Sequence, residues 1–306
     1  MRKMSPRLLA AAIAALGCVF APLTFARDNF VLFEAEAPSC IAVDGEIWFA
    51  AGRHWSYNPH DRCGIWKYDP VADRETLYQN HQLPGYVFAL AQSDSLIYAG
   101  GLGLSVYNKR VRSWHSLPQY DTLVIEDMAV GDSSVWLATS GHGIIASDRY
   151  PWPWLSRRRI TKAQGLSSNR VLSLYLQGDT LFAATYRFGT GTWPERREDL
   201  YGLGLQAVNT RTSSVRDVRL PHDSIIHQHK EWMVTEMYRS PDDSNALRVE
   251  LWQPWEIYHW DYRHAERGVI RDSSRYASPE GALQMPGMPT DSVQRDRVRS
   301  FIRRHL

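Results

Sequence analysis

Apolar residues occur along this chain in short runs that begin at Gly and end at Asp or Asn. The four copies are Gly64-Ile65-Trp66-Lys67-Tyr68-Asp69, Gly103-Leu104-Ser105-Val106-Tyr107-Asn108, Gly143-Ile144-Ile145-Ala146-Ser147-Asp148 and Gly204-Leu205-Gln206-Ala207-Val208-Asn209. Runs of this length, rich in aromatic and β-branched residues and bounded by turn formers, predict β-strands. No long amphipathic helical pattern interrupts them, which argues against an α/β fold.

A second apolar run precedes each Gly-led copy. These runs stand at 47–50, 97–100, 135–138 and 181–184, with a fifth at 232–234 that lacks a clear Gly-led copy after it. Counted from Trp48, Tyr98, Trp136, Phe182 and Trp232, the spacings are 50, 38, 46 and 50 residues. A strand-rich repeat of this period is typical of propeller blades. The sequence therefore predicts an all-β fold, a β-propeller of five four-stranded blades over 27–275.

The blade boundaries follow from the turns between the runs. Blade one is expected to have strands at 40–43, 47–51, 64–68 and 76–79. The other blades are expected at 86–117, 124–160, 170–220 and 224–270, with later strands of blade five at 247–252 and 256–261. Their first turns are predicted at Asp44-Gly45, Ser93-Asp94, Gly131-Asp132 and Gly178-Asp179. A strand at 30–33 is a candidate for completing blade five, and a surface arm is the alternative.

The two ends of the chain do not follow the repeating strand pattern. Residues 1–26 have a basic start and an apolar stretch, which predicts a signal peptide cleaved near Ala26 and export to the periplasm or beyond. A lipoprotein signal ending at Cys18 is the less favoured alternative. Residues 276–306 form an extension that ends in a short helix from Ser292. Its apolar stripe, Val298, Phe301 and Ile302, is expected to dock on the propeller rim.

Charge and cysteine content limit the classes of function and the chemistry that the chain can have. Removal of residues 1–26, with their three basic residues, changes the formal charge from +2 to −1. This excludes the concentrated basic character expected of a nucleic-acid-binding protein. No segment after the signal is long and apolar enough for a transmembrane span. Cys40 and Cys63 remain in an oxidising compartment and could form a disulfide, or stay as two buried thiols.

Two segments resemble a known repeat family. Trp136-Leu137-Ala138-Thr139-Ser140-Gly141-His142-Gly143-Ile144 is similar to the core motif of two-component-regulator propeller repeats, and Gly165-Leu166-Ser167-Ser168-Asn169-Arg170-Val171 to the segment that opens such repeats. The resemblance covers most of 37–220 and implies a propeller. Its members are usually extracytoplasmic sensor domains, many of them thought to recognise glycans. Their membrane span and kinase domain have no counterpart here, so the signalling role is not expected to transfer.

Connector length is the positional clue to a binding site. The connection between the second and third strands is expected to be long in blade one (52–62), blade four (186–202) and blade five (236–246), which are neighbours in a closed ring. Loops on a rigid scaffold commonly carry function. The candidate ligand-binding residues on them are His54, Trp55, Tyr57, Tyr186, Arg187, Trp193, Tyr238 and Arg239. Exposed aromatic rings suit sugar or peptide faces and Arg suits carboxylates; inward-packed aromatics and solvated Arg pairs are the alternative.

Three functions are consistent with this pattern. The favoured one is an exported module that binds a glycan, a peptide or an envelope protein, with no cofactor. A glycoside hydrolase is the first alternative, because Glu126 and Asp127 lie on a predicted inner strand and such enzymes use paired carboxylates. An envelope assembly scaffold is the second. No metal site is predicted, since His227 and His229 lack an evident third ligand.

Overall fold

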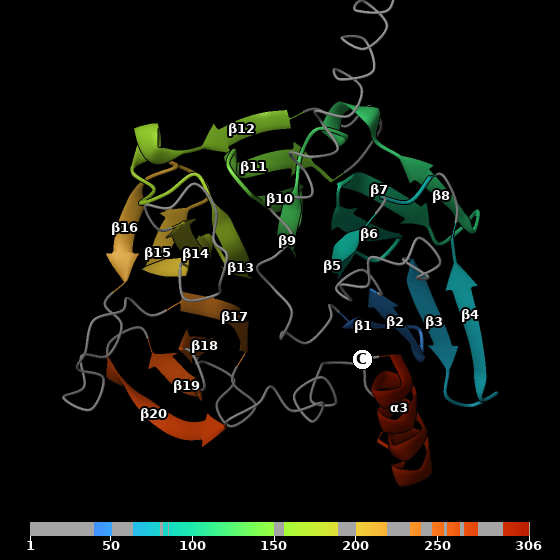
Figure 1. Ribbon diagram of the computed structural model, residues 1–306. Helices are drawn as coiled ribbons and strands as arrows, with labels where there is room; N and C mark the ends of the chain where they lie inside the picture. The colour runs from blue at the N-terminus through green and yellow to red at the C-terminus, as the bar shows by residue number, and fades with distance from the viewer. Residues whose placement is uncertain are drawn as a thin grey trace, which may run out of the picture.

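The computed structural model describes residues 40–50, 64–79, 82–84, 86–149, 156–188, 200–218, 233–239, 247–253, 256–263, 266–274 and 290–305. Within them, twenty strands form five four-stranded antiparallel sheets, each built from four consecutive strands. Figure 1 shows the sheets arranged in sequence order around a common centre. The predicted five-bladed propeller is confirmed. The predicted signal peptide, the strand at 30–33 and Cys63 lie outside the described residues.

The sheets are called blades one to five in chain order. Blade one contains β1 (Cys40–Val43), β2 (Glu46–Ala50), β3 (Ile65–Asp69) and β4 (Arg74–Tyr78). Blade two contains β5 (Val87–Gln92), β6 (Leu96–Gly101), β7 (Gly103–Asn108) and β8 (Ser113–Ser116). Blade three contains β9 (Ile125–Val130), β10 (Ser134–Thr139), β11 (Gly143–Asp148) and β12 (Ser156–Ile160). Blade four contains β13 (Val171–Gln177), β14 (Thr180–Phe188), β15 (Leu200–Asn209) and β16 (Val215–Val218). Blade five contains β17 (Met233–Arg239), β18 (Leu247–Gln253), β19 (Glu256–Arg263) and β20 (Glu266–Ser274).

Backbone geometry explains both the predicted turns and the recurring glycines. Asp44 and Gly45 both have positive φ, 51° and 83°, as a tight type I′ hairpin turn requires. Gly143, which opens the third strand of blade three, has φ of 77°, and a Cβ there would lie 2.1 Å from the carbonyl oxygen of Ile160. Only glycine satisfies both demands. The recurring Gly is therefore a backbone requirement of the blade.

The core lies between the blades, and the second strands of blades two, three and four contribute apolar side chains to the clusters on both sides. In β10, Val135 and Leu137 belong to the apolar cluster with blade two, while Trp136 and Ala138 belong to the cluster with blade four. This alternation follows from the two-residue period of a strand. The first strands β1, β5, β9, β13 and β17 contact one another in that order, so they line the centre.

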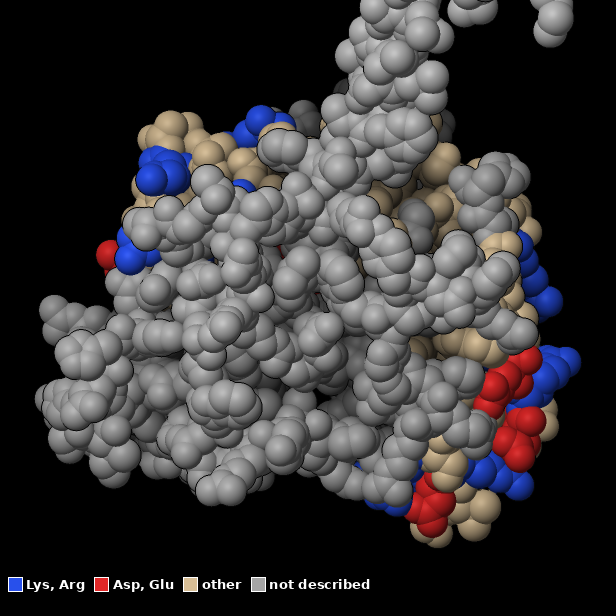
Figure 2. Space-filling model, viewed as in Figure 1, with Lys and Arg blue, Asp and Glu red and all other residues tan. Residues whose placement is uncertain are grey.

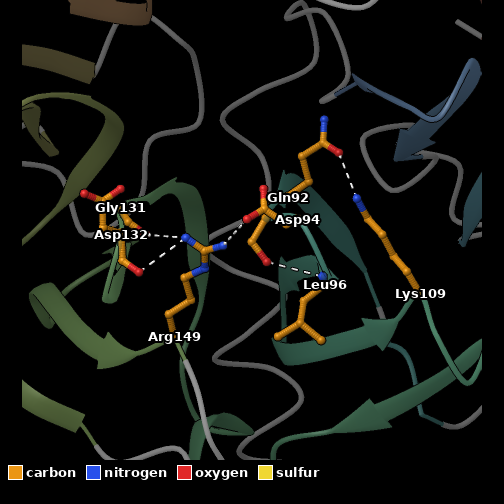
Figure 3. A network of polar contacts seen from close by, with 8 residues as sticks. Gln92, Asp94, Leu96, Lys109, Gly131, Asp132 and Arg149 are labelled. Carbon is orange, nitrogen blue, oxygen red and sulfur yellow. Dashed lines mark hydrogen bonds and ion pairs between the residues drawn. The ribbon is translucent and has the colours of Figure 1, made fainter.

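Polar side chains join neighbouring blades at several points. Arg149 of blade three donates to the carbonyl oxygens of Gly131 and Asp132, 3.3 Å each, and to Asp94 of blade two at 3.3 Å (Figure 3). Gln92 Nε2 donates to the carbonyl of Ala42 in blade one at 2.6 Å. Deeper in the sheet stack, Asp127 of β9 accepts from Ser173 Oγ at 3.1 Å and from the Leu174 amide at 2.7 Å, both in β13.

Blade five departs from the prediction. The run at 232–234 was expected to lie in its second strand, but the corresponding strand, β17, is the first of its sheet. The chain joins β18 to β19 without a Gly-led run, so the landmark used for the other blades is absent there. Blade five is complete with four strands from its own segment, and it needs no strand from 30–33.

The predicted C-terminal helix is present as α3 (Ser292–His305). Val298 and Phe301 are fully buried, as the apolar stripe predicts. They pack on a sheet face of blade one, against Ile47, Phe49 and Tyr68, rather than on the outer rim of the propeller.

The Asp127 contact predicts a measurable contribution to folding. Asp127→Ala removes two inter-blade hydrogen bonds to a carboxylate, so we expect the free energy of unfolding to fall by about 2–3 kcal/mol in urea titrations. Asp94→Ala is the matched control, because the Asp94 side chain is 101% exposed in its ion pair with Arg149. That variant should change stability by less than about 0.5 kcal/mol. Equal effects of the two substitutions would contradict the assigned role of Asp127.

Candidate functional site

One face of the propeller carries the connections between second and third strands. Leu102 of blade two forms a bridge with Val124, just before β9, and Ser140 of blade three forms one with Arg170, just before β13. The Tyr186 amide donates to the carbonyl of Arg170 at 3.1 Å in the same way within blade four. These connections therefore lie beside the starts of the first strands. We call this the top face, a name independent of the view in Figure 1, and the opposite one the bottom face.

The family-like motif of blade three is a structural joint on this face. Thr139 Oγ1 donates to the carbonyl of Gly143 at 2.6 Å and accepts from the His142 amide at 3.0 Å, which fixes the turn. The carbonyl of Asn169 accepts from the amides of Gly141 and Gly143, at 3.0 and 2.8 Å. The opening segment of blade four is thus held against the turn of blade three. The motif therefore has a structural role, and the hydrogen-bonding groups of Thr139 and Asn169 are used within the protein rather than for a ligand.

Blade four projects farther from the top face than blades two and three. Their second and third strands end at the pairs Gly101↔Gly103 and Thr139↔Gly143. In blade four the ladder continues past the equivalent level through Tyr186↔Gly202, Arg187↔Tyr201 and Phe188↔Leu200. At about 3.3 Å per residue, these three further pairs raise a wall of roughly 10 Å beside the first strands.

A polar cluster lies at the base of this wall, between blades three and four. Ser140 Oγ is 3.1 Å from Tyr186 Oη and accepts from Arg170 Nη1 at 3.2 Å. Glu126 lies close enough to affect the titration of Tyr186 and is 8% exposed. Burial, and then the nearby Glu126 carboxylate, raise the pKa of the Tyr186 phenol above its ordinary 10.0. Tyr186 is therefore a neutral hydroxyl, suited to hydrogen bonding and unsuited to nucleophilic attack at neutral pH.

Glu126 occupies a position that recurs in the inner strands. The first strands of blades two to five each have a β-bulge at the same level, and the extra residues are Phe88, Glu126, Leu172 and Thr235. Bulges re-aim side chains at strand ends. Glu126 is the acidic residue among these four described bulge residues. In blade five the residue that follows the bulge is Glu236, so a second inner strand also has an acidic residue beside its bulge.

His142 adds a neutral ring to the same part of the top face. It is exposed, next to the Ser140 turn, and the partial desolvation of its ring, followed by the charge of Arg159, lowers its pKa below 6.5. At neutral pH it is an uncharged donor and acceptor. From the sequence alone, a structural role was expected for the repeat motif that contains Ser140, His142 and Arg170. Their convergence with Tyr186 depends on blade packing, which periodicity does not reveal.

The predicted ligand residues divide into three groups. Tyr186 is fully buried, so its ring does not offer a face to a ligand, whereas Arg187 is exposed. Tyr238 and Arg239 end β17, a first strand, at the bottom face; their predicted place on a connection between a second and a third strand is wrong. The physical reason is the shift of blade five by one strand. The remaining candidates, which lie outside the described residues, are His54, Trp55, Tyr57 and Trp193.

Two further findings concern the described part of the chain. No cluster of three or more His, Cys, Asp or Glu side chains there could hold a metal ion. None of its helices has the length and apolar character needed to cross a membrane.

Comparison with one solved structure agrees with the all-β propeller architecture. The chain is similar to the extracellular domain described as that of a one-component system of B. thetaiotaomicron, with a TM-score of 0.50 and 15% identity over 75% of this chain. It spans only 27% of the length of that structure. The computationally designed protein Ika8 gives a TM-score of 0.47 at 14% identity, over 78% of this chain and 62% of the design. No family model matches the sequence. No curated protein matches it either.

The raised pKa of Tyr186 predicts a change in the pH dependence of stability. A group whose pKa is higher in the folded state stabilises fully below its unfolded pKa, near 10, and that contribution is lost as pH rises further. Removing the phenol by Tyr186→Phe should therefore flatten the loss of stability above pH 10, by up to about 1.4 kcal/mol per pH unit relative to wild type. Urea midpoints measured from pH 8 to 11 test this.

Tyr86→Phe is the control for that experiment, because the Tyr86 side chain is 39% exposed. Its urea midpoints should follow those of the wild type across the whole range. Curves for wild type and Tyr186→Phe that stay parallel above pH 10 would contradict the buried, neutral phenol.

Proposed function

We propose that this chain is an exported propeller of the two-component-regulator repeat type that binds a ligand or protein in the cell envelope through its top face. The observation that carries the proposal is the wall of blade four, with exposed Arg187 on it and the Ser140–Arg170–Tyr186 cluster at its base. A rigid scaffold with a raised edge and convergent polar groups is a common form of binding site.

The chemistry of the site favours a glycan or an extended peptide that bears a carboxylate. Arg187 offers forked donors, and Ser140 and His142 add hydroxyl and imidazole groups that suit hydroxyl-rich ligands. The connectors of blades one and four, 51–63 and 189–199, carry the aromatic residues His54, Trp55, Tyr57 and Trp193. Their rings would provide the flat apolar faces on which sugars stack.

Binding is favoured over hydrolysis by the state of the acidic groups. Asp127 is engaged by Ser173 and the Leu174 amide, so it contributes to blade packing. At the bulges of blades two, four and five the residues equivalent to Glu126 are Phe88, Leu172 and Thr235, none of which is acidic. Glycoside hydrolysis normally uses two such groups.

Export is part of the proposal. The predicted signal at 1–26 places the mature start at Arg27, and the solved structure similar to this chain is an extracellular domain. We expect the protein secreted in a bacterial host to have Arg27 as its first residue by intact-mass measurement. A lipid-modified Cys18 at the amino terminus would instead establish the lipoprotein alternative.

Substitution at the top face tests the binding proposal. Soluble muropeptides and a panel of neutral and acidic glycans would be titrated against the mature chain by calorimetry. Trp193→Ala and Arg187→Glu should each weaken the ligand found by about tenfold or more, with little change in melting temperature. Arg110→Glu is the control: Arg110 is exposed in the turn between the third and fourth strands of blade two, on the bottom face.

The outcomes are separable. Equal losses in Arg110→Glu and Arg187→Glu would show a nonspecific charge effect and overturn the top-face site. No binding across the whole panel, with the protein folded, would overturn the glycan and peptide chemistry. Turnover of a glycan that is lost in Glu126→Gln would establish the hydrolase alternative.

A further inference from the structure

Blade one is apolar on both of its faces. Along β2, Trp48 and Ala50 belong to the cluster shared with blade two, whereas Ile47 and Phe49 belong to a cluster on the opposite face. Tyr68 of β3 joins that second cluster, and all five side chains are at most 2% exposed. A first blade that ended an open stack would have a polar outer face. The second face of blade one therefore has a cover.

In the other four junctions the cover is the next sheet. Separate apolar clusters join blade one to two, two to three, three to four and four to five. In a propeller closed by sheet packing, the fifth cluster would join blade five to blade one. Within the described residues, that cluster instead contains Val298 and Phe301 of α3. Figure 1 shows α3 beside blade one, on the side away from blade two.

The sequence of blade five agrees with this arrangement. Leu247 and Val249 of β18 pack toward blade four. The positions that alternate with them along the strand hold Arg248, Glu250 and Trp252, two of them charged, whereas the second strand of blade one has apolar residues at both sets of positions. The two charged residues make this face costlier to bury against Ile47 and Phe49 than an apolar one.

The contact of α3 with blade one is specific. The Phe301 ring stacks on Tyr68, with 4.6 Å between ring centroids and 8° between planes, and meets Phe49 edge-on at 5.9 Å. Tyr68 is itself fixed, because its hydroxyl donates to Asp73 at 2.7 Å. At the other end, Arg297 Nη1 donates to the carbonyl of Pro70 at 3.0 Å, in the turn between β3 and β4.

We propose that α3 is a removable cap that takes the place of a fifth neighbouring sheet on blade one. The chain reaches α3 only after β20, so the helix can leave blade one without unpairing any strand. Undocking exposes the Ile47–Phe49–Tyr68 face and opens the ring at the junction of its first and last blades. This opening is a sub-global step, lower in free energy than unfolding of the interior blades.

Hydrogen exchange on the full mature chain tests the cap. Phe301→Ala removes the central contact, so amides of α3, β2 and β3 should exchange roughly 100-fold faster, while those of β9–β15 stay within about twofold of wild type. Val293→Ala is the matched control, because Val293 lies on the same helix and is 58% exposed. It should leave every segment unchanged.

Either of two results for Phe301→Ala would overturn the proposal. Unchanged exchange in β2 and β3 would mean that undocking of α3 does not open blade one. Equal acceleration in all blades would mean that α3 belongs to the global folding unit. Should Phe301→Ala fail to fold, the milder Phe301→Leu and Phe49→Leu variants replace it. Their double-mutant cycle must then show coupling, since independent effects also overturn the proposal.

Discussion

Every second strand of blades one to four buries side chains on both of its faces. Most sheets in globular proteins have one solvated face, but here Val135 and Leu137 pack one way while Trp136 and Ala138 pack the other. Each blade therefore needs two neighbours, which produces the radial stack. The same demand at the end of the stack explains α3, because the second face of blade one is as apolar as those between the sheets.

This constraint also decides where function can reside. Because both faces of the inner part of a blade are used for packing, exposed groups lie on the outer strands, at strand ends, in connectors and at inner-strand bulges. The Ser140–Arg170–Tyr186 cluster and the projecting pair Arg187↔Tyr201 are at such positions. The family-like residues Thr139 and Asn169 are not available in the same way, because they hold the blade junction together.

The sequence predicted blades one to four closely because their landmarks have local backbone causes. Asp44 and Gly45 have the positive φ of a tight turn, and Gly143 combines positive φ with a close backbone approach. Few residue types tolerate these conditions, so such residues mark strand ends reliably. Blade five has no Gly between its second and third strands, and the prediction misplaced it by one strand. The cluster around Tyr186 could not be predicted either, since its members are brought together only by contacts between blades. Likewise, the Val298 and Phe301 stripe shows that a helix docks but not on which surface.

The junction between blades five and one, which lies beside α3, is physically related to the proposed binding face. In ring order, blades four and one flank blade five, and their long connectors, 189–199 and 51–63, follow second strands that end at the top face. A ligand that touches both connectors would span this junction, so it would bind the closed ring more tightly than the open one. Linkage requires that such a ligand also favour docking of α3. A helix held by Phe301 and Arg297 allows that equilibrium to be shifted by a modest binding energy, because the proposed undocking unpairs no strand.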